Sequence, residues 1–307
     1  MKISIAFFGT HEFGVKILES LARDDHFSVD LVITQPDKPT GRKQIMTPPP
    51  VKILAERLGI KTQQPETLKN FHLENNRFDL AVVAQYGLLI PKHLFSETAH
   101  GFINTHTSLL PKYRGASPIQ SALINGDTET GVTIMLMDAG MDTGPILSQE
   151  KVSIDPDEVY PELDIRLAKI ASMLLPKTII KFLDGKISPH KQDDTEATLC
   201  KKLSRDDGKI EWNKTTEEIY NLYRGTTPWP GIWTTLNGVR VKLLVIRPGN
   251  KKIEPGHIHC ENDNRILVGT IDGSIEIIRI QFEGKQILDV NACLAGYWLT
   301  LDKQKFS

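Results

Sequence analysis

The fold is decided first by residues 3–21, which read ISIAFFGTHEFGVKILESL. The apolar run Ile3–Phe8 ends at a glycine, and apolar side chains then recur at helical spacing from Phe13 to Leu21. An almost continuous apolar strand, unlike an alternating one, is typical of a parallel sheet that is covered on both faces. Residues 3–21 therefore predict a buried strand followed by a helix.

The same order of apolar strand and amphipathic helix continues along the N-terminal part of the chain. Further apolar strands are predicted at residues 29–34, 80–84, 101–105 and 132–137. Residues 158–183 form a long amphipathic stretch whose expected buried face consists of Leu163, Leu167, Ile170, Leu174 and Ile179. Residues 1–189 are therefore predicted to be an α/β domain with a doubly wound, mostly parallel sheet and right-handed crossovers.

The character of the sequence changes after residue 189. Residues 190–208 are polar, as expected of an exposed linker. A short helical stretch at 216–223 precedes several β-rich runs, and turns are indicated by Asn237-Gly238 and Asp272-Gly273. Such pairs are strong hairpin signals. Residues 209–307 therefore predict a small antiparallel barrel or sandwich.

The composition excludes several classes of protein. The 307 residues are 40% hydrophobic and 24% charged, as in a soluble globular protein, and no apolar run approaches the ~20 residues that span a bilayer. The N-terminal apolar run lacks a cleavage site, which argues against a signal peptide. The three cysteines are widely spaced and odd in number, which favours a reducing compartment and a cytoplasmic protein. A net charge of −1 argues against a protein that coats nucleic acid non-specifically.

Several common cofactor motifs are missing from the sequence. The first predicted strand is not followed by a Gly-x-Gly-x-x-Gly loop, and the chain has neither a phosphate loop of the Walker type nor a Gly-x-Ser-x-Gly elbow. A metal site at His257, His259 and Cys260 is disfavoured, because alternation along a strand places His259 and Cys260 on opposite faces. We therefore expect no metal.

The residues best suited to chemistry lie between Gly101 and Leu147. Asn104 and His106 are two apart at the end of a predicted strand, and hence on one face, where open α/β sheets bind ligands. An Asn amide can stabilise an oxyanion, a His can move a proton, and Asp142 can orient or charge the imidazole, which together suits acyl transfer. The alternative is structural, since such residues also satisfy backbone groups and form turns.

Three motifs in this segment resemble those of the folate-dependent formyltransferases: Asn104-x-His106-x-Ser108-Leu-Leu-Pro111, Arg114-Gly115 and Asp142-Thr143-Gly144. The resemblance implies a formyl donor, 10-formyltetrahydrofolate, and a catalytic set consisting of Asn104, His106 and Asp142. It also implies folate contacts by Ser108, Leu109, Leu110 and Pro111. A rival acid, Asp138, lies outside the Asp-Thr-Gly signature and is interpreted as a turn or surface residue.

Members of this family formylate glycinamide ribonucleotide, amino sugars or the amino acid of initiator tRNA. Resemblance to the tRNA-specific members extends along the whole chain: Phe8-Gly9-Thr10, the loop 34–43, Pro48–Lys52, Tyr86-Gly87, Asn125–Asp127, Asp207-Gly208 and Pro228–Gly231. It implies initiator methionyl-tRNA as the acceptor, with a role in translation initiation. The alternative is an amino-sugar N-formyltransferase that uses the same donor. His11-Glu12 stands where many relatives have Pro-Asp, and this departure involves none of the catalytic set.

The resemblance also implies how tRNA is held. Arg42 and Lys43, in the loop after the second strand, would contact the tRNA, whereas the loop by itself suggests only a mobile surface segment. The C-terminal barrel would resemble an OB-fold and bind tRNA, with Arg240, Lys242, Lys251 and Lys252 as candidate contacts. We expect a monomer whose partners are tRNA and folate, without a membrane.

Overall fold

The computed structural model describes residues 2–41, 43–73, 78–261 and 264–307, the side chains of 298–300 excepted. The chain forms two compact units. The first unit comprises Met1–Gly115, Thr130–Val152 and Asp164–Cys200, and the second comprises Ala116–Glu129, Ser153–Leu163 and Lys201–Ser307. The division into domains 1–189 and 209–307 with a linker at 190–208 stays a prediction.

The first unit is built on a seven-stranded sheet in the order β10-β9-β7-β6-β1-β2-β5. Its strands are β1 (Ile3–Gly9), β2 (Phe27–Ile33), β5 (Thr62–Gln63), β6 (Leu80–Ala84), β7 (Phe102–His106), β9 (Glu129–Leu136) and β10 (Ile146–Ser153). The pairs from β5 through β2, β1 and β6 to β7 are parallel, and β9 is antiparallel to β7. The predicted doubly wound, mostly parallel sheet is therefore confirmed.

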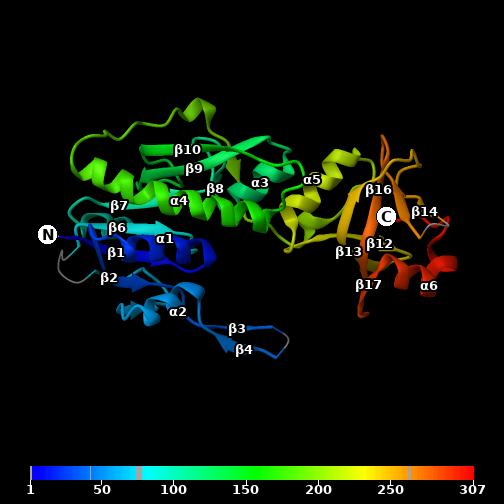
Figure 1. The fold of residues 1–307 in the computed structure, drawn as a ribbon, viewed down its shortest axis with the longest axis horizontal. Helices are drawn as coiled ribbons and strands as arrows, with labels where there is room; N and C mark the ends of the chain where they lie inside the picture. Colours follow the sequence, from blue (N-terminus) through cyan, green and yellow to red (C-terminus); the bar gives the residue numbers. More distant parts are fainter. Residues whose placement is uncertain (1, 42, 74–77, 262–263) are drawn as a thin grey trace. The chain divides into compact units, whose positions relative to one another are not determined.

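Both faces of the central strands are covered. In β1, Ile5 to Phe8 are all fully buried, although successive side chains point to opposite faces. Helix α1 (Glu12–Arg23) lies beside α4 (Tyr160–Leu183), where the Ser20 hydroxyl donates to the Ser172 carbonyl at 2.6 Å (Figure 1). Two further helical segments are α2 (Pro50–Arg57) and η1 (Lys92–Ser96). This double covering explains why the strands are apolar throughout.

Helix α4 buries a slightly different stripe from the predicted one. Leu163, Leu167 and Ile179 are fully buried as expected, but Ile170 and Leu174 are only half-buried. Ala171 and Leu175 take their places. Each step of four residues advances about 40° around a helix with 3.6 residues per turn, so the buried stripe from Leu163 to Ile179 winds gradually around α4.

The second unit combines helices with an antiparallel sheet in the order β12-β13-β16-β15-β14, with β17 paired to β16. Its elements are α3 (Pro118–Ile124), η3 (Asp206–Gly208), α5 (Thr216–Thr226), β12 (Ile232–Leu236), β13 (Val239–Pro248), β14 (Ile258–Cys260), β15 (Ile266–Gly269), β16 (Ser274–Phe282), β17 (Ile287–Asp289) and α6 (Val290–Leu301). Asn237 and Gly238 both have positive φ, 49° and 80°, in the turn from β12 to β13. The hairpin predicted there is confirmed, since such turns match the twist of the two strands.

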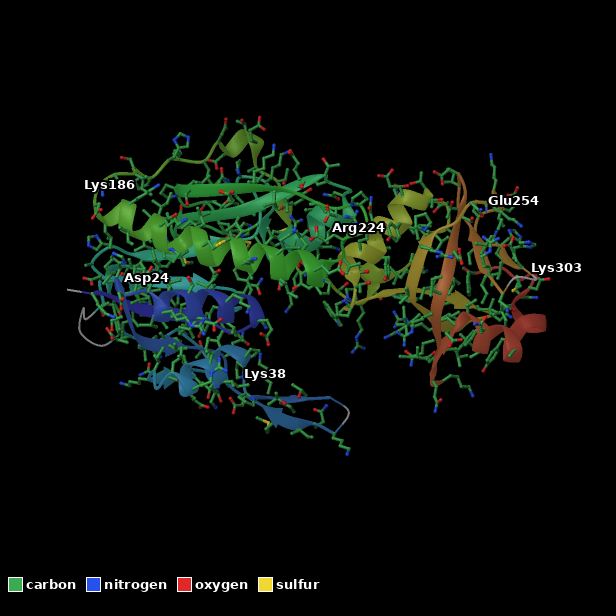
Figure 2. The ribbon with its side chains drawn as sticks, viewed as in Figure 1. Asp24, Lys38, Lys186, Arg224, Glu254 and Lys303 are labelled. Carbon is green, nitrogen blue, oxygen red and sulfur yellow. The ribbon has the colours of Figure 1, made fainter. Side chains whose placement is uncertain are left out.

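A buried arginine explains why residues 153–163 belong to the second unit. Arg224 on α5 is 4% exposed and is labelled in Figure 2. Its guanidinium donates to the carbonyl oxygens of Glu158 (3.0 Å) and Asp155 (2.9 Å) and to the side chain of Asn221 (2.7 Å). A buried cation needs such acceptors, so the preceding segment is held against α5.

The last residues close the C-terminal sheet into a barrel. On one side, the backbone N–H of Ile258 donates to the carbonyl of Gln304 at 2.8 Å. On the other side, Thr235 of β12 and Ser307 exchange two backbone hydrogen bonds, at 3.0 and 2.9 Å. Because residues 304–307 bond to both β14 and β12, the sheet edges are joined, and the predicted antiparallel barrel is confirmed.

Two general expectations concern cysteines and membranes. Cys200, Cys260 and Cys293 all belong to the described part of the chain and are buried thiols. Burial raises the pKa of Cys260 to about 12 and that of Cys293 to about 11. Among the described residues, no helix combines the length and the apolar character needed to cross a bilayer.

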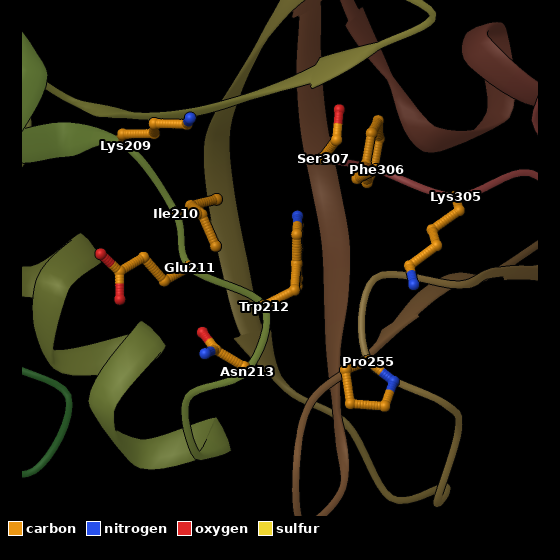
Figure 3. Close-up of a pocket in the computed structure, with 9 residues that line it drawn as sticks. All are labelled: Lys209, Ile210, Glu211, Trp212, Asn213, Pro255, Lys305, Phe306 and Ser307. Atoms are coloured by element: carbon orange, nitrogen blue, oxygen red, sulfur yellow. The ribbon is translucent and has the colours of Figure 1, made fainter.

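We predict that Phe306→Ala lowers the free energy of unfolding by about 3–5 kcal/mol, the usual cost of removing a buried Phe side chain. Phe306 is 1% exposed and stacks on Trp212, with ring centroids 5.8 Å apart (Figure 3). Urea denaturation measures the change. Lys305→Ala, at the exposed neighbouring position, should change stability by less than about 0.5 kcal/mol. Equal losses in the two variants would contradict this role of Phe306.

Candidate active site

Strand β7 carries the first two candidate catalytic residues to one edge of the sheet. Asn104 and His106 lie at its carboxyl end on the same face. Strands β1 and β6 run parallel to β7, so their carboxyl ends meet at this edge, where open α/β sheets bind ligands. His106 is 5% exposed and Asn104 is half-buried.

The loop between β9 and β10 brings Asp142 to the same place. The Asn104 amide nitrogen lies 3.4 Å from Asp142 Oδ1, and His106 Nδ1 lies 3.7 Å from Asp142 Oδ2. The carboxylate retains 17% side-chain exposure. The structure therefore brings together all three residues, although they come from segments 38 positions apart.

The orientation of the imidazole is set by a backbone carbonyl. His106 Nε2 lies 2.9 Å from the carbonyl oxygen of Tyr113, an acceptor only, so Nε2 carries a proton and donates it. Nδ1 then faces the Asp142 carboxylate. In this arrangement His106 can take up a proton at Nδ1 with a negative charge beside it.

A glycine allows the carboxylate of Asp142 to be held from the backbone. The Gly115 N–H donates to Asp142 Oδ2 at 2.9 Å. Gly115 has a φ of 123° in strand β8 (Arg114–Gly115), which pairs with β11 (Leu199–Cys200). A Cβ atom at residue 115 would lie 2.2 Å from the Cys200 carbonyl oxygen, so only glycine fits.

A buried glutamine in the segment predicted to be an exposed linker supports the catalytic loop. Gln192 is 5% exposed, and its amide N–H groups donate to the carbonyl oxygens of Asp142 (2.9 Å) and Gly144 (2.7 Å). Its amide oxygen accepts two hydrogen bonds from Arg114, which also pairs with Asp194 in η2 (Asp194–Glu196). We call Arg114 and Gln192 the clasp. The motif Arg114-Gly115 is visible in the sequence, but nothing in the polar composition of 190–208 singles out Gln192.

The residues expected to contact folate have different surroundings. Ser108 is fully buried, with its hydroxyl donating to the Lys112 carbonyl at 2.6 Å, and Leu110 is 3% exposed. Leu109 and Pro111 are half-buried. The side chains of Leu109 and Pro111 are therefore the ones that can reach a ligand, whereas Ser108 and Leu110 shape the turn. Folate contact by any of the four stays a prediction.

Asp138 is a turn residue in the structure, as interpreted from the sequence. It is exposed, and its Oδ1 accepts hydrogen bonds from the Gly140 N–H at 3.0 Å and the Thr143 hydroxyl at 2.6 Å. These bonds shape the loop that carries Asp142.

The basic loop after β2 forms a hairpin of β3 (Lys38–Thr40) and β4 (Ile45–Thr47). Lys43 is exposed in its turn, and Arg42 lies outside the described residues. At the base of the hairpin, Asp37 accepts hydrogen bonds from Gln64 at 2.7 Å and Lys52 at 2.9 Å, which hold the pKa of its carboxyl below the ordinary value. Contact of Arg42 and Lys43 with tRNA stays a prediction.

The basic residues singled out in the barrel are not equally available. The Arg240 guanidinium lies 3.6 Å from the centroid of the Trp233 ring, and Lys251 is paired with Glu261. Lys242 and Lys252 are exposed. A groove of about 590 Å³ on this unit adds two exposed cations that sequence reasoning missed, Lys209 and Lys305 (Figure 3).

Comparison with known proteins identifies the family. Residues 1–179 match the family described as Formyl transferase, and residues 202–297 match Formyl transferase, C-terminal domain. The chain is 41% identical over 311 residues to a methionyl-tRNA formyltransferase of Thermodesulfovibrio yellowstonii, covering 100% of both chains. It belongs to the methionyl-tRNA formyltransferase family. Another such enzyme, from Geobacter metallireducens, is 40% identical over 298 residues and 96% of both chains.

A solved relative of this formyltransferase shares its fold at lower identity. The N-formyltransferase from Helicobacter canadensis, in complex with folinic acid and dTDP-3-aminofucose, superposes with a TM-score of 0.69 at 22% identity. The match covers 90% of this chain and 98% of that one. The formyltransferase family uses folate-derived formyl donors, so the coarse prediction of a folate-dependent enzyme is confirmed.

Proposed function

We propose that this chain transfers the formyl group of 10-formyltetrahydrofolate to the α-amino group of methionyl initiator tRNA, in translation initiation. The identity of about 40% with methionyl-tRNA formyltransferases over the full length supports the acceptor. The observation that carries the chemistry is that Asp142 lies within 4 Å of both Asn104 and His106. In this proposal the protein acts in the cytoplasm as a monomer.

Asn104 is the proposed oxyanion donor. Its amide makes a long contact of 3.4 Å with Asp142, so turning it toward a substrate oxygen costs little. Attack of the amine on the formyl carbon makes a tetrahedral centre whose oxygen becomes negative, and a preorganised amide donor stabilises that charge. His106 is the second group positioned to stabilise it.

His106 and Asp142 are the proposed proton-handling pair. A new C–N bond forms between the amine and the formyl carbon, and the bond from that carbon to the folate nitrogen breaks. The amine proton must therefore reach the folate nitrogen. Nδ1 of His106 can take up a proton beside the Asp142 carboxylate and release it, while Tyr113 holds the ring from its other side.

The surroundings of these residues fit a folate donor. The donor supplies an activated formyl group on an aryl nitrogen, which needs no metal for this transfer. Leu109 and Pro111 are partly accessible apolar side chains in the segment that follows His106, as a flat heterocycle requires. We propose that tRNA contacts Arg42 and Lys43 in the sequence after β2 and exposed cations of the barrel, with Ser108 and Leu110 shaping the folate site.

The test offers the purified full-length protein labelled 10-formyltetrahydrofolate with one of three acceptors. These are methionyl initiator tRNA, an amino-sugar nucleotide, and no acceptor. We expect formyl-methionyl-tRNA to form at a rate far above the other two. Preferential formylation of the sugar would establish the amino-sugar alternative, and binding of folate or RNA without turnover would overturn the proposed activity.

A further inference from the structure

A group of metal-ligating side chains lies away from the candidate active site. His72 precedes β6, His93 lies in η1, and Glu97 directly follows η1. One ligand atom from each residue lies within 4.8 Å of the other two, and this is the one group of three or more such residues that the described part of the chain contains. Thr98, which directly follows Glu97, bridges to Phe78 just before β6, whereas Asn104 lies at the carboxyl end of β7.

His93 is arranged as a ligand with a lone pair available. His93 Nε2 lies 2.8 Å from the backbone carbonyl oxygen of Phe71, so this nitrogen donates its proton. Nδ1 of the neutral ring then carries the free lone pair. Histidines that bind a metal through one ring nitrogen commonly donate the N–H of the other ring nitrogen to a carbonyl oxygen in this way. The rings of His72 and His93 are 4.9 Å apart, which brings two imidazoles to one place.

Glu97 is oriented toward the histidines by the backbone. Its Oε2 accepts a hydrogen bond from the Leu73 N–H at 2.5 Å, while its Oε1 lies 2.6 Å from His72 Nδ1. The Glu97 side chain is 17% exposed and that of His72 is 68% exposed. The backbone therefore holds the carboxylate, and the more exposed His72 side chain can turn away from the short contact to admit an ion.

We propose that His72, His93 and Glu97 bind a divalent transition-metal ion, with zinc as the best match. Two imidazoles and one carboxylate are a common zinc ligand set, and water can complete a four-coordinate site at this exposed position. The ligands come from two chain segments, so the ion would cross-link the stretch before β6 to η1. Leu73 and Leu94, beside these ligands, are buried in the same apolar cluster, which gives the cross-link a rigid support.

A simple histidine–carboxylate pair elsewhere in the chain provides a matched control. His26 Nδ1 lies 2.7 Å from Asp24 Oδ1, and the His26 side chain is 66% exposed, much like His72 (Asp24 is labelled in Figure 2). This pair is not part of any group of three potential ligands among the described residues. It therefore reproduces the His72–Glu97 contact without the second imidazole.

The experiment titrates the chelator-treated, full-length protein with Zn²⁺ at neutral pH and follows the heat of binding. We expect the wild type and His26→Gln each to bind one equivalent of Zn²⁺ in a saturable way. His72→Gln and Glu97→Gln should each weaken binding by about 100-fold or more. With Co²⁺ as a second probe, visible absorption bands of a bound ion should appear in the wild type and be lost in His72→Gln. Circular dichroism checks that each variant is folded.

The same titration can overturn the proposal. The site would be refuted if the wild type bound no saturable equivalent of Zn²⁺. It would also be refuted if both His72→Gln and Glu97→Gln still bound one equivalent as tightly as the wild type. Equal weakening in His26→Gln would also refute it, because that result would point to non-specific binding at exposed histidines. None of these readouts depends on formylation, so the metal site and the proposed function can fail separately.

Discussion

Asn104→Ala is expected to lower kcat for formylation by about 10²- to 10³-fold, the usual cost of losing one oxyanion donor. The effect should fall on kcat more than on KM, because the amide is proposed to act on charge that develops only in the transition state. Initial rates with methionyl initiator tRNA and the folate donor measure both constants.

The same substitution should hardly affect folding. Asn104 is half-buried, and its side chain makes one long hydrogen bond of 3.4 Å, so the free energy of unfolding should change by less than about 1 kcal/mol. Asn250→Ala, at an exposed position, is the control for loss of an Asn side chain. A folded Asn104→Ala protein with near-native turnover would remove Asn104 from the catalytic set.

Gln192→Glu is expected to reduce kcat by about 10²-fold through misplacement of Asp142. The substitution keeps an oxygen that can accept from Arg114, but it replaces the amide group that donates to the carbonyls of Asp142 and Gly144. Two carbonyl oxygens would then face a carboxylate oxygen, so the loop must move. KM for both substrates should change little, since Gln192 is a positioning residue in this account.

Gln192→Leu separates positioning from stability. It removes all four hydrogen bonds of the Gln192 amide and leaves the buried Arg114 guanidinium short of acceptors, which should lower the free energy of unfolding by roughly 2–4 kcal/mol. Lys191→Ala, at the exposed neighbouring position, should alter neither stability nor kcat. If Gln192→Glu is folded and fully active, the clasp does not position Asp142.

Local features of the chain were predictable wherever a few neighbouring residues decide the structure. The apolar run of β1 and the Asn237-Gly238 turn can be recognised from the local sequence, because side-chain periodicity and backbone φ preferences act within a few residues. The placement of Asn104 and His106 on one face also follows from their spacing alone. Even so, the buried stripe of α4 passes through Ala171 and Leu175, since the neighbours of a helix, not only its hydrophobicity, choose which side is covered.

Contacts between distant segments were not predictable in the same way. The composition around Gln192 indicates a linker, yet Gln192 is buried. Its four hydrogen bonds join Arg114 to the Asp142 loop, which lies about 50 positions before Gln192 in the chain. Barrel closure likewise depends on the positions of β12 and β14 in the fold, because residues 304–307 must reach hydrogen-bond partners on both strands. Such polar groups are buried only when partners arrive from elsewhere in the fold.

The sequence by itself therefore determined the alternating α/β architecture, the antiparallel character of the C-terminal part, and the residue types of the catalytic set, because these depend on periodicity, turn chemistry and motif. Only the tertiary structure decided that Asp142 meets Asn104 and His106, that Arg114 and Gln192 hold it, and that His72, His93 and Glu97 converge. The physical reason is that hydrogen bonding and metal coordination act over about 3 Å, and only the folded backbone sets which distant residues come that close.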